Sequence, residues 1–338
     1  MRKLLFIFAA AALCLVSCGK DNGGNNEGGS DSYWANHGAV AKGIKSISSD
    51  NYTDYYDQNG RLVSTKMTYG ETKWTYNSAG YPVKIESQDL DENGKPQGDP
   101  NIQTFEYGNG NKFCPIPMSP GNIVHIFEQG LVKGLSKITW SGNHYGNGEM
   151  VYTFSGNKLT ASTTVTGGPF EVDFDDIIVE YEGDYPVRIP GSKEDFSFEY
   201  GPFTYQANGM FESYVELMMT DGFVYMERTI TPSDQVKNQM VKGKEVSKWW
   251  NLTYDEETGK ATGVADLYNT ETTVWTYNEH GDCIKEETTH TQAGSEHSVT
   301  VNEYTYDSHG NWIKCKGSIA NDGKVVNSWE EERTIEYY

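Results

Sequence analysis

The chain has 338 residues and a formal net charge of −21, because 48 acidic residues outnumber 27 Lys and Arg. A field of that sign repels phosphate backbones and anionic lipid head groups, which disfavours nucleic-acid binding and electrostatic docking on a membrane. The 23 Tyr, 8 Trp and 36 Gly, without long runs of Leu, Ala, Glu or Lys, favour strands and tight turns over helices.

The first 17 residues predict a lipoprotein signal peptide. Arg2 and Lys3 form a positive start, and Leu4 to Val16 is an apolar stretch too short to anchor the chain across a bilayer. The stretch ends in Leu15-Val16-Ser17-Cys18, which looks like a lipobox. The sequence therefore predicts lipidation of Cys18; the alternative is an ordinary secretory signal that is cut nearby.

Residues 18–32 are predicted to be the lipidated Cys and a flexible linker. The letters after Cys18, GKDNGGNNEGGSDS, offer almost nothing that could be buried. We expect an exported protein that is held to the outer membrane, on its periplasmic or cell-surface side, through the lipid on Cys18 alone.

One pattern repeats along the rest of the chain: two aromatic residues two positions apart, then Asp or Asn, and then a Gly about three positions later. Aromatic residues at this spacing lie on one face of a strand, Asp or Asn opens a turn, and Gly takes a positive φ before the chain returns. Each unit therefore predicts a β-hairpin. Clear copies are Tyr56 to Leu62, Trp74 to Gly80, Trp275 to Lys285 and Tyr304 to Lys314.

The repeats predict an all-β fold, an antiparallel up-and-down meander of about twenty strands built from repeat hairpins. The strands are expected to form a large soluble barrel or a strongly curved sheet. Residues 33–230 are assigned to this β-meander domain. Residues 231–338 hold further repeat hairpins, which either continue it or form a small second β domain.

Two resemblances follow from these residues. Tyr56-Asp57-Gln58-Asn59-Gly60-Arg61-Leu62 and the unit after it are similar to the tyrosine-aspartate (YD) repeats of the Rhs family. Ile44-Lys45-Ser46-Ile47 and Leu135 to Trp140 resemble blocks of exported lipoproteins from gut Gram-negative anaerobes. Those lipoproteins carry an uncharacterised domain with a porin-like antiparallel barrel, so this resemblance implies a fold and no activity.

Two groups of polar residues suggest metal binding. Asp89, Asp91 and Asn93 match the first half of a calcium loop, although Pro100 stands where such a loop places its last carboxylate. A polar hairpin connection explains the same residues. His280 and His309 share the slot before a turn Gly and are interpreted as turn residues. No cofactor is predicted.

The aromatic excess suggests a ligand surface. Trp and Tyr side chains stack on sugar rings, but the aromatic residues of the repeat are expected to fill the core. The candidates for ligand contact are the tryptophans outside the repeat, which are Trp140, Trp249, Trp250 and Trp329.

No nucleophile elbow, phosphate loop or dinucleotide motif occurs in the sequence. The leading hypothesis is a non-catalytic binding module for a glycan, a peptide or an envelope protein. The alternatives are a hydrolase that acts on polysaccharide and a structural component of the envelope.

Overall fold

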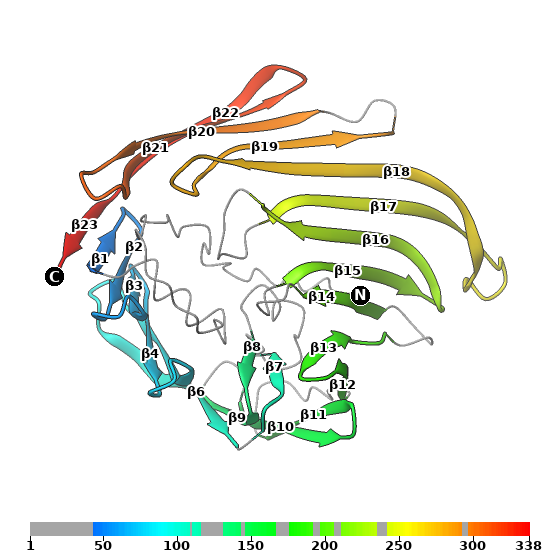
Figure 1. Cartoon of the computed structure of the whole chain (residues 1–338), viewed down its shortest axis with the longest axis horizontal. Coiled ribbons are helices and arrows are strands. Elements are labelled where there is room, and N and C mark those ends of the chain that lie inside the picture. Colours follow the sequence, from blue (N-terminus) through cyan, green and yellow to red (C-terminus); the bar gives the residue numbers. More distant parts are fainter. Residues whose placement is uncertain are drawn as a thin grey trace.

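The computed structural model describes residues 43–108, 110–115, 131–142, 146–166, 176–191, 197–205, 211–234, 242–292 and 297–338. The predicted signal peptide, Cys18 and the linker lie outside these ranges. The described residues form strands and turns (Figure 1), and they contain no helix long and apolar enough to cross a membrane.

The strands, in chain order, are β1 (Ile44–Ser48), β2 (Tyr52–Tyr56), β3 (Leu62–Met67), β4 (Gly70–Tyr76), β5 (Pro82–Leu90), β6 (Pro96–Tyr107), β7 (Phe113–Pro115), β8 (Leu131–Lys133), β9 (Leu135–Ser141), β10 (Asn147–Ser155), β11 (Lys158–Thr166) and β12 (Ile177–Glu182). They continue as β13 (Tyr185–Arg188), β14 (Ser197–Tyr205), β15 (Phe211–Thr220), β16 (Phe223–Pro232), β17 (Lys242–Tyr254), β18 (Ala261–Tyr277), β19 (Cys283–His290), β20 (Ser298–Tyr306), β21 (Trp312–Asn321), β22 (Lys324–Glu332) and β23 (Thr334–Tyr337).

The strands form two large sheets and one small one. The first sheet has 12 strands in the order β13-β12-β11-β10-β9-β6-β5-β4-β3-β2-β1-β23, and the second has 9 strands in the order β14 to β22. The pair β7-β8 stands apart as a two-stranded sheet. The predicted all-β, antiparallel up-and-down fold is confirmed, and the described strands form open curved sheets rather than a closed barrel. Residue 230, at the predicted division of the chain, lies within β16.

The two large sheets meet at two joints. At the first, the backbones of Ile189 and Tyr200 exchange two hydrogen bonds, of 2.7 and 2.9 Å. At the second, Arg333 alone separates β22 from β23, and its guanidinium lies 3.6 Å from the centre of the Trp312 ring. Arg333 is only 6% exposed, and this burial lowers its pKa. A buried cation therefore marks the point where the chain passes between the sheets.

The repeat units end in one kind of turn. In the first, the Asp57 side chain accepts hydrogen bonds from the backbone N–H groups of Asn59 (2.9 Å) and Arg61 (3.0 Å), and Gly60 has a φ of 81°. The acceptors at the equivalent position of the other units are Asn77, Asp91, Asn278 and Asp307. An Asp or Asn is required because its oxygen ties two amides that the strands leave unpaired.

The repeat tyrosines connect one hairpin to the next. The Tyr76 hydroxyl donates to the carbonyl of Leu62 (2.8 Å), and Tyr107 does the same to Pro82 (2.7 Å). Tyr304 donates to the carbonyl of Cys283 (3.0 Å). Each acceptor is the first residue after a turn, so the repeat includes a link between neighbouring hairpins as well as an apolar ring.

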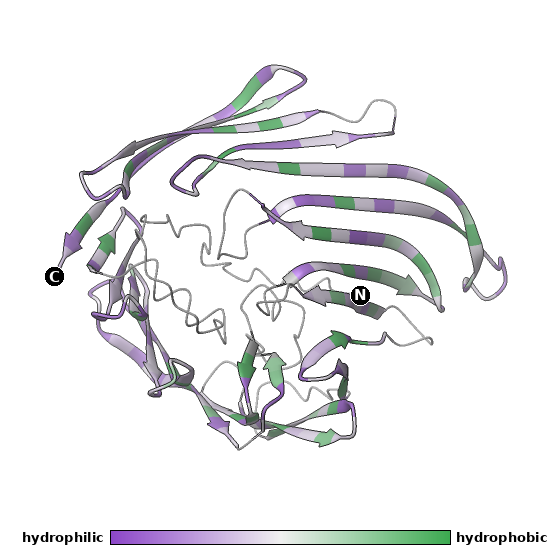
Figure 2. Cartoon of the chain, in the orientation of Figure 1, coloured by the Kyte–Doolittle hydropathy of each residue, from purple (hydrophilic) through white to green (hydrophobic). Residues whose placement is uncertain are grey.

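The hydrophobic core lies where β7 and β8 cover one face of β9 to β14. Its members include Phe113, Cys114, Val132, Leu135, Ile138, Trp140, Met150, Leu159, Val179, Tyr200 and Phe203. Figure 2 shows β7 and β8 as mainly hydrophobic, whereas β17 and β18 are mostly hydrophilic with scattered hydrophobic bands. We call the face of the nine-stranded sheet that carries Tyr200 and Phe203 its inner face, because it continues from this core.

Candidate functional site

The four tryptophans predicted to contact a ligand lie on three strands. Trp140 is in β9 of the first sheet, Trp249 and Trp250 are in β17, and Trp329 is in β22. From β17 to β22 is five strand positions, which is about 24 Å at 4.8 Å per strand. The structure therefore does not bring the four rings together into one platform, and a ligand contact at any of them stays a prediction.

Two of these tryptophans cover a glycine on the neighbouring strand. A Cβ atom on Gly148 would lie 2.3 Å from the Trp140 ring, and one on Gly317 would lie 2.2 Å from the Trp329 ring. Trp140 is 8% exposed and Trp329 is 37% exposed. Both rings fill the space above a glycine, one inside the core and one at the surface.

Trp249 and Trp250 point to opposite faces of β17, since side chains alternate along a strand. Trp249 lies opposite Met226, which is fully buried on the inner face, and opposite Asn269. Trp250 lies opposite Leu267, which is 49% exposed. Only Trp249 reaches the inner face.

A row of polar side chains crosses the inner face beside Trp249. The strand register places one residue from each of six neighbouring strands, β14 to β19, in line: Tyr200, Glu216, Arg228, Ser247, Glu271 and His290. Glu216 is 6% exposed and Ser247 is 3% exposed. The inner face thus changes from the apolar core at β14 to buried polar side chains within one strand.

The charges at the start of this row neutralise each other. The Arg228 guanidinium contacts the Glu216 carboxylate at 3.1 Å and the Glu245 carboxylate at 3.3 Å, and Lys242 contacts Glu245 at 3.3 Å. Buried carboxylates keep their charge only beside such partners. Burial, together with the nearby Glu216 carboxylate, raises the pKa of the Tyr200 phenol, so Tyr200 stays neutral.

The end of the row forms a group that we call the inner-face cluster: Ser247, Trp249, Asn269, Glu271 and His290. The Nδ1 atom of His290 lies 3.6 Å from the Glu271 carboxylate and 3.5 Å from the Asn269 amide. Trp249, Glu271 and His290 are partly exposed, whereas Ser247 is 3% and Asn269 is 8% exposed, and the Asn269 amide oxygen accepts the Gln292 N–H at 3.2 Å. The partly exposed indole, carboxylate and imidazole suit a ligand with many hydroxyls, which can lay an apolar face on the indole and exchange hydrogen bonds around it.

Sequence reasoning missed Asn269, Glu271 and His290 as neighbours of Trp249. Asn269 and Glu271 lie on β18, His290 lies on β19 and Trp249 lies on β17, and no motif spacing connects the four. Only the cross-strand register brings them together, and a single sequence does not specify that register.

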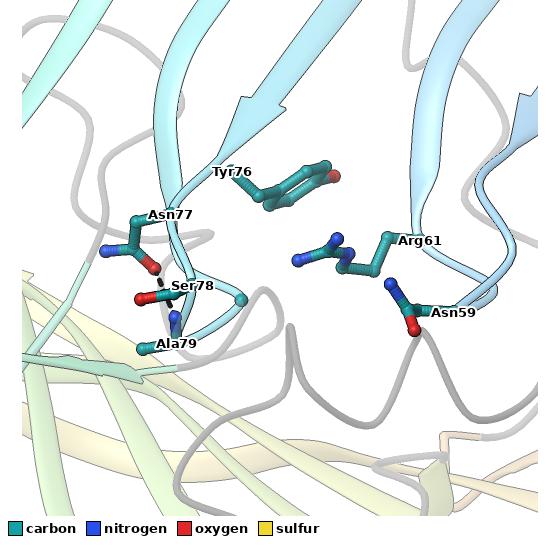
Figure 3. A pocket seen from close by; sticks show the side chains of 7 residues that line it. Asn59, Arg61, Tyr76, Asn77, Ser78 and Ala79 are labelled. Atoms are coloured by element: carbon teal, nitrogen blue, oxygen red, sulfur yellow. Dashed lines mark hydrogen bonds between the residues drawn. The ribbon is translucent and has the colours of Figure 1, made fainter.

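A polar hollow of about 510 Å³ lies between two repeat turns, as Figure 3 shows. Asn59, Arg61, Tyr76 and Ser78 line it, and Arg61 lies 5.3 Å from the centre of the Tyr76 ring. The Arg61 guanidinium also pairs with Asp57 at 2.7 Å. Similar contacts stack Tyr81 on Tyr107, His280 on Tyr306 and His309 on Tyr337. The hollow is therefore one instance of a repeated contact between hairpins.

The predicted calcium residues occupy another repeat turn. Oδ1 of Asp91 accepts the backbone N–H groups of Asn93 and Lys95, both at 2.8 Å, so this carboxylate holds the turn. Asp89 and Asn93 line an open hollow of about 670 Å³ beside it. Within the described ranges, no three His, Cys, Asp or Glu side chains lie where they could share a metal ion. Calcium binding at Asp89, Asp91 and Asn93 stays a prediction.

No family model and no curated protein matches the sequence. Among solved structures, the chain is similar to a porin-like protein from Bacteroides uniformis ATCC 8492, with 11% identity and a TM-score of 0.34 over 88% of this chain and 98% of that one. It is also similar to a porin-like protein from Bacteroides vulgatus ATCC 8482, with 8% identity and a TM-score of 0.25 over 87% of this chain and 98% of that one. The resemblances to YD repeats and to gut lipoproteins stay predictions.

Proposed function

We propose that this chain is an exported lipoprotein of the outer membrane that binds a neutral glycan on the inner-face cluster and does not catalyse a reaction. The observation that carries the proposal is the position of Trp249 beside Asn269, Glu271 and His290 on a polar face. An indole next to hydrogen-bonding side chains matches the two surfaces of a sugar, its apolar face and its hydroxyl edge.

The charge of the protein narrows the ligand class. The chain carries a net charge of −21, and Glu271 lies within the cluster. Acidic polysaccharides would be repelled both by the overall field and by this carboxylate. We therefore expect neutral glycans to bind better than sulfated or uronic-acid glycans of similar length.

Trp249 and Trp250 provide a matched pair of variants for the test. A panel of immobilised neutral and acidic glycans identifies a ligand, and its affinity is then measured by calorimetry. Trp249→Ala should weaken binding about tenfold or more, because a buried aromatic contact typically contributes more than about 1.4 kcal/mol. Trp250→Ala, on the opposite face of the same strand, should leave the affinity unchanged. Equal losses in the two variants would remove the cluster from the binding surface.

The non-catalytic part of the proposal is tested on the same ligand. After prolonged incubation with the protein, the chain length of the bound glycan should stay constant. Shortened products that depend on Glu271 would favour the alternative of a polysaccharide hydrolase.

Membrane attachment is tested at Cys18. Cys18→Ala should release a folded protein from the membrane fraction, since no second anchor is proposed. Retention of the Cys18→Ala chain in the membrane fraction would contradict a lipid on this residue.

A further inference from the structure

The outer edge of β22 is open. β22 pairs with β21, and the chain then passes through Arg333 into β23, which pairs with β1. Among the described strands, none pairs with the other side of β22. The segment Lys324–Glu330 is exposed at every position, whereas the next residue, Glu331, is half-buried.

An edge strand of this length is a template for another strand. Its register against β21 shifts between Val325 and Asn327, and the Asn327 side chain accepts the Ser328 N–H at 2.9 Å. The segment also exposes three apolar side chains: Val325 at 62%, Val326 at 56% and Trp329 at 37%. The other end of the same sheet differs, since β14 meets β13 through the Ile189–Tyr200 bridge. Strand addition is therefore expected at β22.

The local charge indicates which strand would be added. Between Trp312 and Arg333 the four cations Lys314, Lys316, Lys324 and Arg333 balance the four anions Asp322, Glu330, Glu331 and Glu332. The chain as a whole carries −21, so two copies repel each other over most of their surfaces. The β21–β22 hairpin carries no net charge, so this repulsion does not act between the hairpins of two copies.

The two ends of the open segment carry opposite charges. If two copies of the segment run antiparallel about Asn327, Lys324 of one copy faces Glu330 of the other at both ends. Glu330 also contacts Lys314 and Lys316 of its own chain. The apolar residues Val325, Val326 and Trp329 then lie between these two ion pairs. The segment is therefore complementary to itself in the antiparallel direction.

We infer that two copies of this chain associate by antiparallel pairing of Lys324–Glu330 about a two-fold axis at Asn327, which joins two nine-stranded sheets edge to edge. The interface is isologous, so it closes at a dimer. The inference does not depend on the proposed glycan site, which lies on another part of the sheet.

A cysteine at the axis provides the direct test. Directly opposed residues of an antiparallel pair have Cα atoms about 4.5–5.5 Å apart, which suits a disulfide. Under mild oxidation Asn327→Cys should give a covalent dimer on a non-reducing gel. Val264→Cys, at a position that is 47% exposed on β18, should give no more dimer than the unsubstituted chain. Equal yields from the two variants would overturn the inference.

A charge reversal provides the second test, measured by sedimentation equilibrium on the full chain carrying Cys18→Ala, so that no acyl group drives association. This chain should dimerise, and adding Lys324→Glu should weaken dimerisation about threefold or more. Lys66→Glu, at an exposed position of β3, should have no such effect. A chain that stays monomeric, or a dimer that is indifferent to Lys324→Glu, would contradict the proposed pairing.

Discussion

The two large sheets differ in what their inner faces carry. In the first sheet, Ile138, Met150 and Leu159 are at most 1% exposed and pack under β7 and β8. In the second, the corresponding face carries Glu216, Arg228 and Ser247. The same hairpin architecture thus supports an apolar core in one region and buried polar side chains in the other. The repeat therefore determines strand and turn positions, whereas the residues between the turns determine what each face does.

The largest expected effect is in the apolar region. Ile138→Ala removes a side chain that is 1% exposed, which should lower the free energy of unfolding by about 2–5 kcal/mol through lost burial and a cavity. Val274→Ala, at a position that is 40% exposed in the second sheet, should cost less than about 1 kcal/mol. Chemical denaturation measures both values. Similar losses of unfolding free energy in Ile138→Ala and Val274→Ala would mean that the two sheets do not differ in packing.

In the second sheet, the free energy of unfolding should depend on the pairing of charged side chains. Arg228→Ala leaves Glu216, which is 6% exposed, without its cation and should cost about 1–3 kcal/mol. The matched control is Lys248→Ala, which breaks an exposed ion pair with Glu227 and should cost at most about 1 kcal/mol. A loss at Arg228 no larger than that at Lys248 would show that the row of charges does not stabilise the sheet.

Each of the two large sheets has one glycine that is covered by a tryptophan ring. Gly148→Ala forces a methyl group against Trp140, which is confined in the core, and should cost about 1–3 kcal/mol. Gly317→Ala creates the same clash with Trp329, but this ring is 37% exposed and can turn away. Gly317→Ala should therefore lower the free energy of unfolding by less than about 1 kcal/mol. Thermal unfolding measures the stability loss of each variant. A larger loss for Gly317→Ala than for Gly148→Ala would contradict the assignment of Trp140 to the core.

The smallest effect concerns the turns, which the two sheets share. Burial alone would raise the pKa of Asp57, but backbone N–H donors and the Arg61 guanidinium lower it overall. The pKa of Asp307 is also lowered, because hydrogen bonds from Tyr337 and from backbone amides outweigh burial. A lowered folded-state pKa stabilises the fold above the unfolded value of about 3.9, and this contribution is lost as the pH falls through the folded value.

Asn77 and Asn278 occupy the same turn position as these aspartates and make the same two amide contacts. Asp57→Asn with Asp307→Asn should therefore keep the amide contacts but lose the stabilisation by the ionised carboxylates at neutral pH, and it should flatten the loss of stability below about pH 4 by the same amount. Urea unfolding at several pH values measures this. An unchanged acid dependence would show that other groups control it.

The local parts of the fold were predictable from the sequence. The turns at Asp57, Asn77, Asn278 and Asp307 follow from an Asx residue and a Gly at fixed spacing, because both act within five residues. The number of strands followed from counting such turns. The pairing of β6 with β9, which bypasses β7 and β8, was not predictable, because it depends on contacts between distant segments.

The candidate site was predictable only in part. Trp249 stood out because it lies outside the repeat, but so did Trp140 and Trp329, which cover glycines. Distinguishing them requires the strand register, since a neighbouring residue such as Trp250 faces the other way. Asn269, Glu271 and His290 give no signal until the register places them beside the indole.

Side-chain footprinting can show whether a ligand binds the inner face of the nine-stranded sheet. Hydroxyl-radical labelling with and without saturating neutral glycan reports the protection of individual aromatic side chains. We expect the ligand to protect Trp249 and His290 while Trp250 and Tyr76 keep their reactivity. Protection of Trp250, or of Tyr76 in the hollow between the turns, with Trp249 unchanged would contradict it.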